Sequence, residues 1–148
     1  MTAPTSLAMP GQLIRRLHQH STQVFAAAMA EAGEDLTPVQ FAMLDALAEA
    51  PGMDQATLAR LIGKDRATVG SVAERLARKG LIARVPSIRD RRAILLALTA
   101  DGAALHARLS PRVRGLQDDI LPGLSPEERA LFADLARRAL AAADGVEG

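Results

Sequence analysis

Apolar residues recur at helical spacing along most of the chain, and capping residues mark where several of these segments begin. The clearest start is TPVQ at residues 37–40, where an N-cap threonine, a proline at the first helical position and a glutamine three residues after the cap can satisfy free backbone donors. A helix is therefore predicted from Pro38 to the turn at Pro51-Gly52. Its apolar positions at helical spacing are Phe41, Leu44, Leu47 and Ala48.

Two shorter helices are predicted directly after this turn. Asp54 can cap the first, which ends where Gly63 adopts the left-handed conformation. Asp65 can cap the second, which ends at Gly80. The pair forms a helix-turn-helix pattern, although a buried helical hairpin with surface arginines has the same pattern. The side chains expected to pack inward are Leu58, Leu61 and Ile62 in the first helix and Val69, Val72, Ala73 and Leu76 in the second.

The second of these helices turns donor groups outward. In a helix-turn-helix protein this face enters the major groove, where arginine can bridge O6 and N7 of guanine and hydroxyl groups can reach bases or phosphates. Gly70 costs roughly 1 kcal/mol of helix stability against alanine, so we interpret it as a position where the helix backbone approaches DNA. The residues left on the outward face are Arg66, Thr68, Gly70, Ser71 and Arg75.

A β-hairpin is predicted after the second helix. The runs Leu81–Val85 and Ala93–Leu98 are rich in β-forming residues, while Pro86 and the charged residues between the runs cannot continue a buried strand. A protruding hairpin beside a recognition helix is a wing, whose arginines can contact phosphates or enter the minor groove. The alternative is a solvated hairpin whose charges keep a strand edge soluble. The arginines around this turn are Arg84, Arg89, Arg91 and Arg92.

Three further helices are predicted outside this region. The first runs from about Gly11 to Ala32, the second begins after Thr99, and the third begins after Ser125 with another capping box. Pro111 should kink or stop the second of them. These helices carry more apolar surface than the helix-turn-helix and its wing could cover, which favours a homodimer. Their apolar positions include Leu13, Leu17, Val24, Ala28, Leu105, Leu109, Leu131, Phe132, Leu135 and Leu140.

Composition and charge narrow the class of protein. The 148 residues are 49% hydrophobic, no apolar run is long enough to span a bilayer, and the N-terminus lacks the features of a secretory signal. We therefore expect one domain in a cytoplasmic protein. The window from Asp54 to Arg92 holds ten basic and four acidic residues, a net charge of +6, whereas the remainder sums to −5. This asymmetry indicates that the window faces a polyanion, although a solvated charged surface would also show it.

The sequence lacks the motifs that are typical of enzymes and of metal-binding proteins. It has no cysteine, no glycine-rich phosphate loop, no nucleophile elbow and no HExxH or paired-carboxylate arrangement on a recognisable scaffold. His18, His20 and His106 have no clustered acidic partner in the sequence, and no thiolate is available to a metal. We therefore expect neither an enzyme nor a metal site nor a cofactor.

Residues 36–102 resemble the winged helix of the MarR (multiple antibiotic resistance regulator) family of bacterial transcription factors. The most specific parts are DRATVGSVAERLARKGLI at 65–82 and DRR at 90–92, followed after a strand by LTADG at 98–102. The resemblance implies a mainly α (α+β) fold in a single domain, 1–148, with a winged helix-turn-helix lobe at 36–99 and a two-stranded β wing. It also implies dimerisation helices at 7–33 and 100–144, and an obligate dimer that binds a palindromic operator on double-stranded DNA.

Carried over by position, the resemblance implies roles for individual residues. Arg92 matches the family's minor-groove wing arginine, and Asp90 matches the acidic residue that orients the wing. The stretch Thr68–Val72 matches the base-reading face, from which Gly70 departs because threonine or serine is common at its position. The residues expected at the DNA are Arg66, Thr68, Val69, Ser71, Arg75, Arg89, Asp90, Arg91 and Arg92.

The resemblance also places a small-molecule cleft between the dimerisation helices and the DNA-binding lobe. The residues expected near this cleft include arginine, histidine and phenylalanine, which together would suit an aromatic carboxylate or its thioester. In the alternative interpretation the phenylalanines of this set are core residues and its histidine lies on the surface. The sequence thus predicts a dimeric DNA-binding repressor released by a small aromatic ligand, or else a winged-helix protein-interaction module without specific DNA binding. The expected ligand-binding set is Arg16, His18, Phe25, Phe41 and Asp45.

Overall fold

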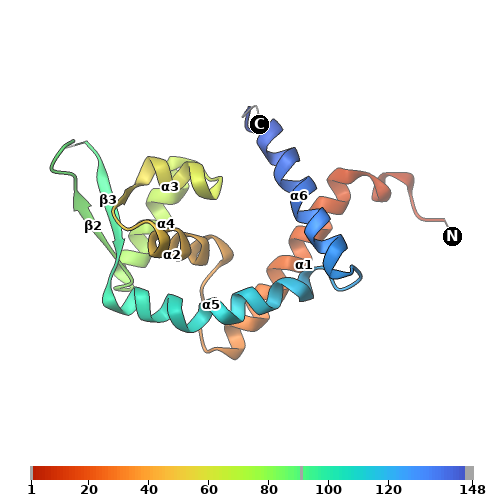
Figure 1. Ribbon diagram of the computed structural model, residues 1–148, viewed down its shortest axis with the longest axis horizontal. Helices are drawn as coiled ribbons and strands as arrows, with labels where there is room; N and C mark the ends of the chain where they lie inside the picture. The colour runs from red at the N-terminus through yellow and green to blue at the C-terminus, as the bar shows by residue number, and fades with distance from the viewer. Residues whose placement is uncertain (1, 91, 146–148) are drawn as a thin grey trace.

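Figure 1 shows a winged-helix lobe and a pair of outer helices joined by one long helix. The computed structural model describes residues 2–90 and 92–145. The long helix α5 (Ala100–Ile120) packs against α2 (Pro38–Glu49) in the lobe and against α1 (Pro10–Glu31) outside it. The elements are a 3-10 helix η1 (Thr5–Ala8), α1 (Pro10–Glu31), α2 (Pro38–Glu49), β1 (Met53–Asp54), α3 (Gln55–Ile62), α4 (Arg66–Arg78), β2 (Ile82–Pro86), β3 (Ile94–Leu98), α5 (Ala100–Ile120) and α6 (Pro126–Ala143).

The predicted capping boxes are confirmed. The hydroxyl of Thr37 accepts a hydrogen bond from the Gln40 N–H, and the Gln40 side chain accepts one from the Thr37 N–H, at the start of α2. Ser125 and Glu128 form the same reciprocal pair before α6. Each box satisfies two backbone donors that the first helical turn leaves free, so both helices begin where the sequence predicts.

Helices α3 and α4 form the predicted helix-turn-helix. Asp54 Oδ1 accepts a hydrogen bond of 2.7 Å from the first turn of α3, and Gly63 ends that helix with a φ of 71°. Leu58 is fully buried, but Leu61 is 63% exposed, which corrects the expectation that both lie on the buried side. The buried direction of α3 points between Leu58 and Ala59, and Leu61 lies on the opposite side of Leu58 around the helix.

The wing belongs to a sheet of three strands rather than the expected two. The strand order is β1-β3-β2, and both pairings are antiparallel. Met53 of β1 lies opposite Leu96 of β3, while the edge strand β2 ends at Pro86, which lies opposite Ile94. Strand β1 spans only two residues, so no alternating pattern could reveal it from the sequence.

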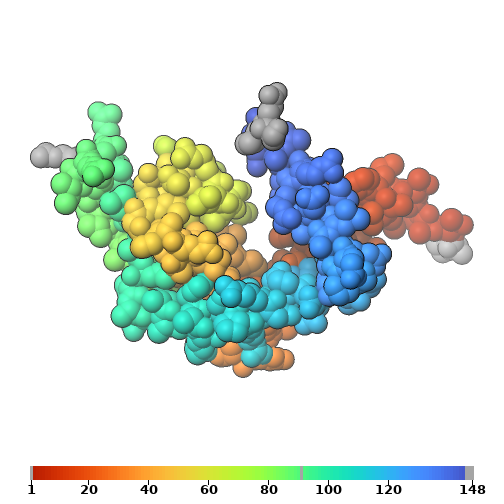
Figure 2. All heavy atoms as spheres, in the orientation of Figure 1, coloured from red at the N-terminus to blue at the C-terminus, as the bar shows by residue number. Residues whose placement is uncertain are grey.

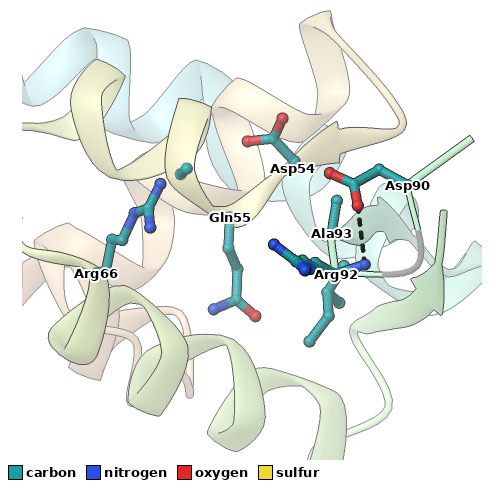
Figure 3. Close-up of a pocket in the computed structure, with 8 residues that line it drawn as sticks. Asp54, Gln55, Arg66, Asp90, Arg92 and Ala93 are labelled. Carbon is teal, nitrogen blue, oxygen red and sulfur yellow. Dashed lines mark hydrogen bonds between the residues drawn. The ribbon is translucent and has the colours of Figure 1, made fainter.

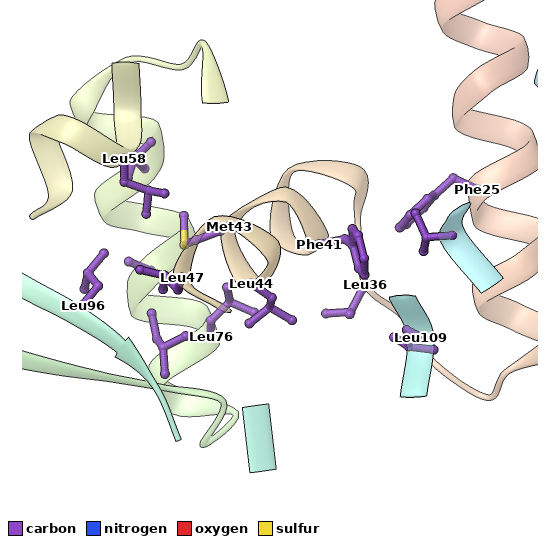
Figure 4. Packing of buried hydrophobic residues seen from close by; sticks show 14 of the residues in the cluster. Phe25, Leu36, Phe41, Met43, Leu44, Leu47, Leu58, Leu76, Leu96 and Leu109 are labelled. Atoms are coloured by element: carbon purple, nitrogen blue, oxygen red, sulfur yellow. The ribbon is translucent and has the colours of Figure 1, made fainter. Parts of the chain in front are cut away.

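One apolar core fills the space around α2 and extends toward α1 (Figure 4). Met43, Leu44 and Leu47 of α2 are buried together with residues from α3, α4 and β3. Phe25 of α1 and Phe41 of α2 continue the core, with their ring centroids 6.3 Å apart in an edge-on arrangement. The interpretation of these two phenylalanines as core residues is therefore confirmed.

Helix α5 continues through Pro111, so the stop considered there is wrong. The helix extends from Ala100 to Ile120, and it has buried residues on both sides of the proline, among them Leu109 and Val113. A proline inside a helix removes one backbone hydrogen bond. The packing of α5 against α1 and α2 offsets that loss, because it buries apolar surface on both sides of the proline.

The outer helices leave apolar side chains uncovered. No residue of α6 is buried, and Figure 2 shows an open hollow between α6 and the winged-helix lobe, with α5 as its floor. Among the described residues, no helix combines the length and the hydropathy that a membrane span requires. The exposed apolar side chains of the outer helices and the N-terminal segment are Leu7, Met9, Leu13, Ile14, Leu131, Phe132, Leu135 and Leu140.

Candidate nucleic-acid interface and effector cleft

Helix α4 is held at its start by Asp65. The carboxylate of Asp65 accepts hydrogen bonds of 2.8 Å from the N–H and from the hydroxyl of Thr68. The Thr68 N–H, and then its hydroxyl, lower the pKa of Asp65 because they stabilise the charged carboxylate. Thr68 is half-buried, and its hydroxyl is oriented by the cap rather than free to rotate.

The outward face of α4 carries most of the residues that were expected there. Arg66, Ser71 and Arg75 are exposed, and they project from a helix whose opposite face is buried at Ala73 and Leu76. This arrangement leaves donor groups free along one side of the helix. A shallow hollow on this side is lined by Ala67, Thr68, Ser71, Val72 and Arg75.

Two further residues of α4, Val69 and Gly70, were expected near DNA. Val69 is 0% exposed and belongs to the apolar core, as its helical spacing predicts. It therefore cannot contact DNA directly, although the resemblance places it at the base-reading face. Gly70 faces α3, because a Cβ atom added to it would lie 3.2 Å from Nε2 of Gln55. The glycine therefore leaves room for the side chain of Gln55. The interpretation that Gly70 brings the helix backbone close to DNA stays a prediction.

Hydrogen bonds brace the tip of the wing between β2 and β3. The hydroxyl of Ser87 accepts hydrogen bonds from the N–H groups of Arg89, at 3.2 Å, and Asp90, at 3.3 Å. Asp90 in turn accepts a hydrogen bond of 3.0 Å from the Arg92 N–H. Asp90 therefore holds the turn of the wing. Arg91, which was expected at the DNA, lies outside the described residues.

A groove of about 390 Å³ separates the wing from the starts of α3 and α4 (Figure 3). Arg66 enters this groove from α4 and Arg92 enters it from the wing, on opposite sides of Gln55. Sequence reasoning missed Gln55, because nothing in its local spacing marks it. The other lining residues are Asp54, Ala56, Asp90, Ala93 and Ile94.

The arginines of this face differ from others in the chain in their ion pairing. Arg108 and Arg112 of α5 pair with Glu34 and Glu31, so their charges are largely compensated. Across residues 2–90 and 92–145, no carboxylate lies within ion-pair distance of the arginines on the outer face of α4 and on the wing. Unpaired arginines can neutralise phosphates without first breaking an ion pair. The arginines concerned are Arg66, Arg75, Arg84, Arg89 and Arg92.

A second cleft, of about 320 Å³, lies between α2 and α5. Phe41 and Asp45 line it, as expected for an effector cleft, and Phe25 packs against the edge of Phe41. Arg16 and His18 are exposed on α1 and are not among its lining residues, so the structure brings together only part of the expected ligand-binding set. The remaining lining residues are Glu49, Ser110, Val113, Arg114 and Gln117.

His106 and Asp45 form a hydrogen-bonded pair beside this cleft. His106 Nε2 lies 2.7 Å from Asp45 Oδ1, and its ring stacks on Phe41 with centroids 5.7 Å apart. The pair connects α2 of the winged-helix lobe to α5. Sequence reasoning left out the α5 residues, although His106, Ser110 and Gln117 are spaced so that they share one side of a helix.

Comparison with known proteins places the chain among transcriptional regulators. Residues 34–93 match the MarR family. The transcriptional regulator HosA of Escherichia coli is 33% identical over 104 residues, which cover 70% of this chain and 77% of HosA. The transcriptional repressor NicR of Pseudomonas putida is 31% identical over 128 residues, which cover 86% of this chain and 80% of NicR.

Solved structures agree with this relationship over almost the whole chain. PcaV of Streptomyces coelicolor in complex with its natural ligand has a TM-score of 0.86 and 37% identity, covering 97% of this chain and 99% of PcaV. BpsR of Bordetella bronchiseptica, whose DNA binding is regulated by 6-hydroxynicotinic acid, has a TM-score of 0.85 and 30% identity, covering 93% and 97%. A MarR variant of Escherichia coli complexed with operator DNA has a TM-score of 0.80 and 25% identity, covering 92% and 94%. The chain therefore belongs to the MarR family of transcriptional regulators.

Proposed function

We propose that the protein is a homodimeric transcriptional repressor that binds a palindromic operator and is released from it by a small aromatic carboxylate. The observation that carries the DNA-binding part is the set of unpaired arginines on α4 and the wing, of which Arg66 and Arg92 enter one groove from the two elements. A solvated surface would not need its arginines to converge in this way. A polyanion that contacts both α4 and the wing would need arginines on both elements.

In this proposal α4 enters the major groove and the wing follows the adjacent minor groove. Arg66, Ser71 and Arg75 face bases and phosphates from α4, and Thr68 contributes its cap-oriented hydroxyl. Arg89 and Arg92 contact the minor groove or its phosphates, while Asp90 holds the turn and Arg91 belongs to the set by its sequence position alone. Val69 is left out because it is buried.

The homodimer would be built by the outer helices, at 7–33 and 100–144. The lobe at 36–99 would then project from each side of the dimer. The support is the row of uncovered apolar side chains on α1 and α6, since α6 has no buried residue in the single chain. Two symmetry-related α4 helices would meet successive major grooves about 34 Å apart, which requires a palindromic operator.

The effector would bind in the cleft between α2 and α5. Arg114 supplies a cation for a carboxylate, the ring of Phe41 supplies an apolar wall, and Glu49 and Asp45 supply acceptors for a ring hydroxyl. Arg16 and His18 do not line the cleft, so we assign the cation to Arg114. The regulation of BpsR by 6-hydroxynicotinic acid supports a hydroxylated aromatic acid as the ligand class.

Release would follow from a change in the spacing of the two recognition helices. The cleft lies where the lobe meets α5, and the pair of His106 with Asp45 connects the two across it. A ligand that changes the angle between the winged-helix lobe and α5 therefore makes the dimer lose contact with one half-site of the operator, and no groove-facing residue needs to move. Tenfold weaker DNA affinity requires about 1.4 kcal/mol of tighter ligand binding to the DNA-free state.

The effector proposal is tested by titrating 6-hydroxynicotinate and other aromatic acids into a protein–operator complex. We expect wild-type protein and Arg16→Ala to release DNA at similar acid concentrations, whereas Arg114→Ala should need at least about tenfold more acid. Acids that bind the protein and leave operator affinity unchanged would contradict the release mechanism. Equal sensitivity of Arg114→Ala and wild type would contradict the assigned cation.

The second candidate is a winged-helix module that binds proteins rather than DNA. It predicts weak DNA binding with no sequence preference, whereas a regulator neutralises several phosphates and loses affinity steeply as salt rises. The unpaired arginines favour the regulator, and the word repressor in the name of NicR supports the sign of regulation. Affinity for a selected duplex, measured over a range of salt concentrations, separates the two candidates.

A further inference from the structure

Ile88 is an apolar side chain placed at the most exposed point of a basic wing. It is 101% exposed, which is more than any other large hydrophobic side chain of residues 2–90 and 92–145. Most of the others lie on η1, α1 and α6, where the proposed dimer would cover them. The dimer proposal gives Ile88 no such cover, because the wing projects from the opposite end of the molecule (Figure 1).

The backbone around Ile88 is ordered by its neighbours. Ser87, which precedes it, accepts hydrogen bonds from the N–H groups of Arg89 and Asp90, which follow it. The Ser87 N–H also donates to the carbonyl oxygen of Ala93 across the hairpin, at 3.0 Å. The isoleucine is therefore presented by a braced turn, so little backbone entropy is lost when it meets a partner.

The charges around the tip indicate the partner. Arg89 is adjacent in sequence, and Arg84 and Arg92 flank the turn, all without an ion-pair partner among the described residues. An apolar tip surrounded by unpaired arginines suits a surface that is anionic at its edges and apolar within. The minor groove of DNA has this character, since phosphates line its rims and deoxyribose lines its walls.

We propose that Ile88 enters the minor groove with the wing and packs against its sugar walls at an A·T-rich step. The inference rests on the proposed DNA binding and adds to it a contact that carries no charge. Guanine places its 2-amino group in the minor groove, where it would crowd an isoleucine, whereas an A·T pair leaves the floor open. Ile88 thereby contributes affinity and an A·T preference next to the half-site.

Ile88→Ser and Ile88→Leu test the proposal, with Val85→Ser as the matched control. Val85 is also apolar and exposed, at 51%, but it lies on β2 away from the tip. We expect Ile88→Ser to weaken operator binding about tenfold, equivalent to about 1.4 kcal/mol, while Ile88→Leu and Val85→Ser stay close to wild type. The slope of log affinity against log salt should not change, because no phosphate contact is lost.

A second measurement addresses the groove itself. Replacing A·T pairs under the wing by G·C should weaken wild-type binding, and inosine in place of guanine should restore it, because inosine lacks the 2-amino group. Ile88→Ser should respond much less to these replacements. Equal affinity of Ile88→Ser and wild type, a loss that Val85→Ser shares, or a loss that appears as a smaller salt slope would each overturn the inference. If wild-type protein selects no duplex at all, the proposed DNA binding fails first and this contact with it.

Discussion

Because Gly102 has no Cβ atom, the first turn of α5 can lie against the backbone of Leu81, the residue before β2. A Cβ atom added there would lie 1.9 Å from the carbonyl oxygen of Leu81. Thr99 closes the same junction, because its N–H donates to the Leu81 oxygen at 3.1 Å and its hydroxyl to the Gly80 oxygen at 2.6 Å. The glycine of the LTADG motif therefore has a packing reason that does not involve DNA.

We predict that Gly102→Ala lowers the free energy of unfolding by about 1–3 kcal/mol, since the backbone must move to relieve the contact. Gly115→Ala is the matched control, because Gly115 lies in the same helix and an added Cβ there meets no atom within 4 Å. That change should be neutral or stabilise by about 0.5–1 kcal/mol. Urea unfolding of both variants measures the difference, and a Gly102→Ala protein as stable as wild type would refute the contact.

Arg92 is the wing residue on which the DNA proposal depends most. Arg92→Ala should weaken operator binding by about 1–3 kcal/mol without loss of folding, because the side chain is exposed. Arg112→Ala serves as the control, since Arg112 pairs with Glu31 on the scaffold. Fluorescence anisotropy with a labelled operator gives both affinities. An equal effect of the two changes would show that Arg92 acts only through overall charge.

Which residues could be predicted depended on whether their neighbours are local in sequence. The exposure of Arg66 and Arg75 follows from helical spacing within α4 alone. The neighbour of Gly70, Gln55, could not be predicted because it belongs to another helix. The partner of His106 could not be predicted either, because Asp45 reaches it only when α2 packs on α5. Local patterns contain no information about such contacts.

At the scale of elements, caps were the most predictable features and short strands the least. A cap needs only residues within one turn, so Thr37, Asp65 and Ser125 could be identified from local sequence. Strand β1 is defined by pairing with β3, far along the chain, and left no local signal. Pro111 shows the converse, because tertiary packing keeps α5 helical where a local rule allows a stop.

The caps should also make stability depend on pH. Hydrogen bonds from Thr68 lower the pKa of Asp65 in the folded protein, so this group stabilises the fold at pH values above its unfolded pKa of about 4. That contribution is lost as the pH falls through the folded pKa. We therefore expect stability to decrease below about pH 4, and Asp65→Asn, which keeps an acceptor oxygen but cannot titrate, to show a weaker decrease.

Urea unfolding at several pH values between neutral and acid checks this prediction. Asp134→Asn is the control, because Asp134 lies inside α6 and caps no helix. It should show the same acid dependence as wild type. If Asp65→Asn also follows wild type through the whole range, the Asp65 cap contributes nothing to the pH dependence.

At the scale of the whole molecule, the fold class is the mainly helical winged helix that the sequence predicts. The role of the outer helices in dimerisation stays a prediction. Their exposed apolar side chains on α1 and α6 need a cover, and a second copy of the chain is our proposal for it. The hollow beside α6 in Figure 2 leaves room for that copy.

We predict that Leu135→Glu converts the dimer to a monomer, because it places a charge in the uncovered apolar row of α6, where Leu135 is 48% exposed. Leu61→Glu is the matched control, since Leu61 is also an exposed leucine, at 63%, but lies on α3 in the winged-helix lobe. Sedimentation velocity distinguishes the two states. A wild-type protein that sediments as a monomer, or a Leu135→Glu protein that remains a dimer, would contradict this interface.

We infer that two copies of the chain read a palindromic operator with α4 and the wing. Selection of duplexes from a random pool, followed by affinity measurements on the selected duplex over a range of salt concentrations, tests it most directly. We predict a palindromic consensus with half-sites about 10 base pairs apart, two chains per duplex, and a log affinity that falls linearly and steeply with log salt. A pool without enriched sequences, or binding that is insensitive to salt, would contradict the claim.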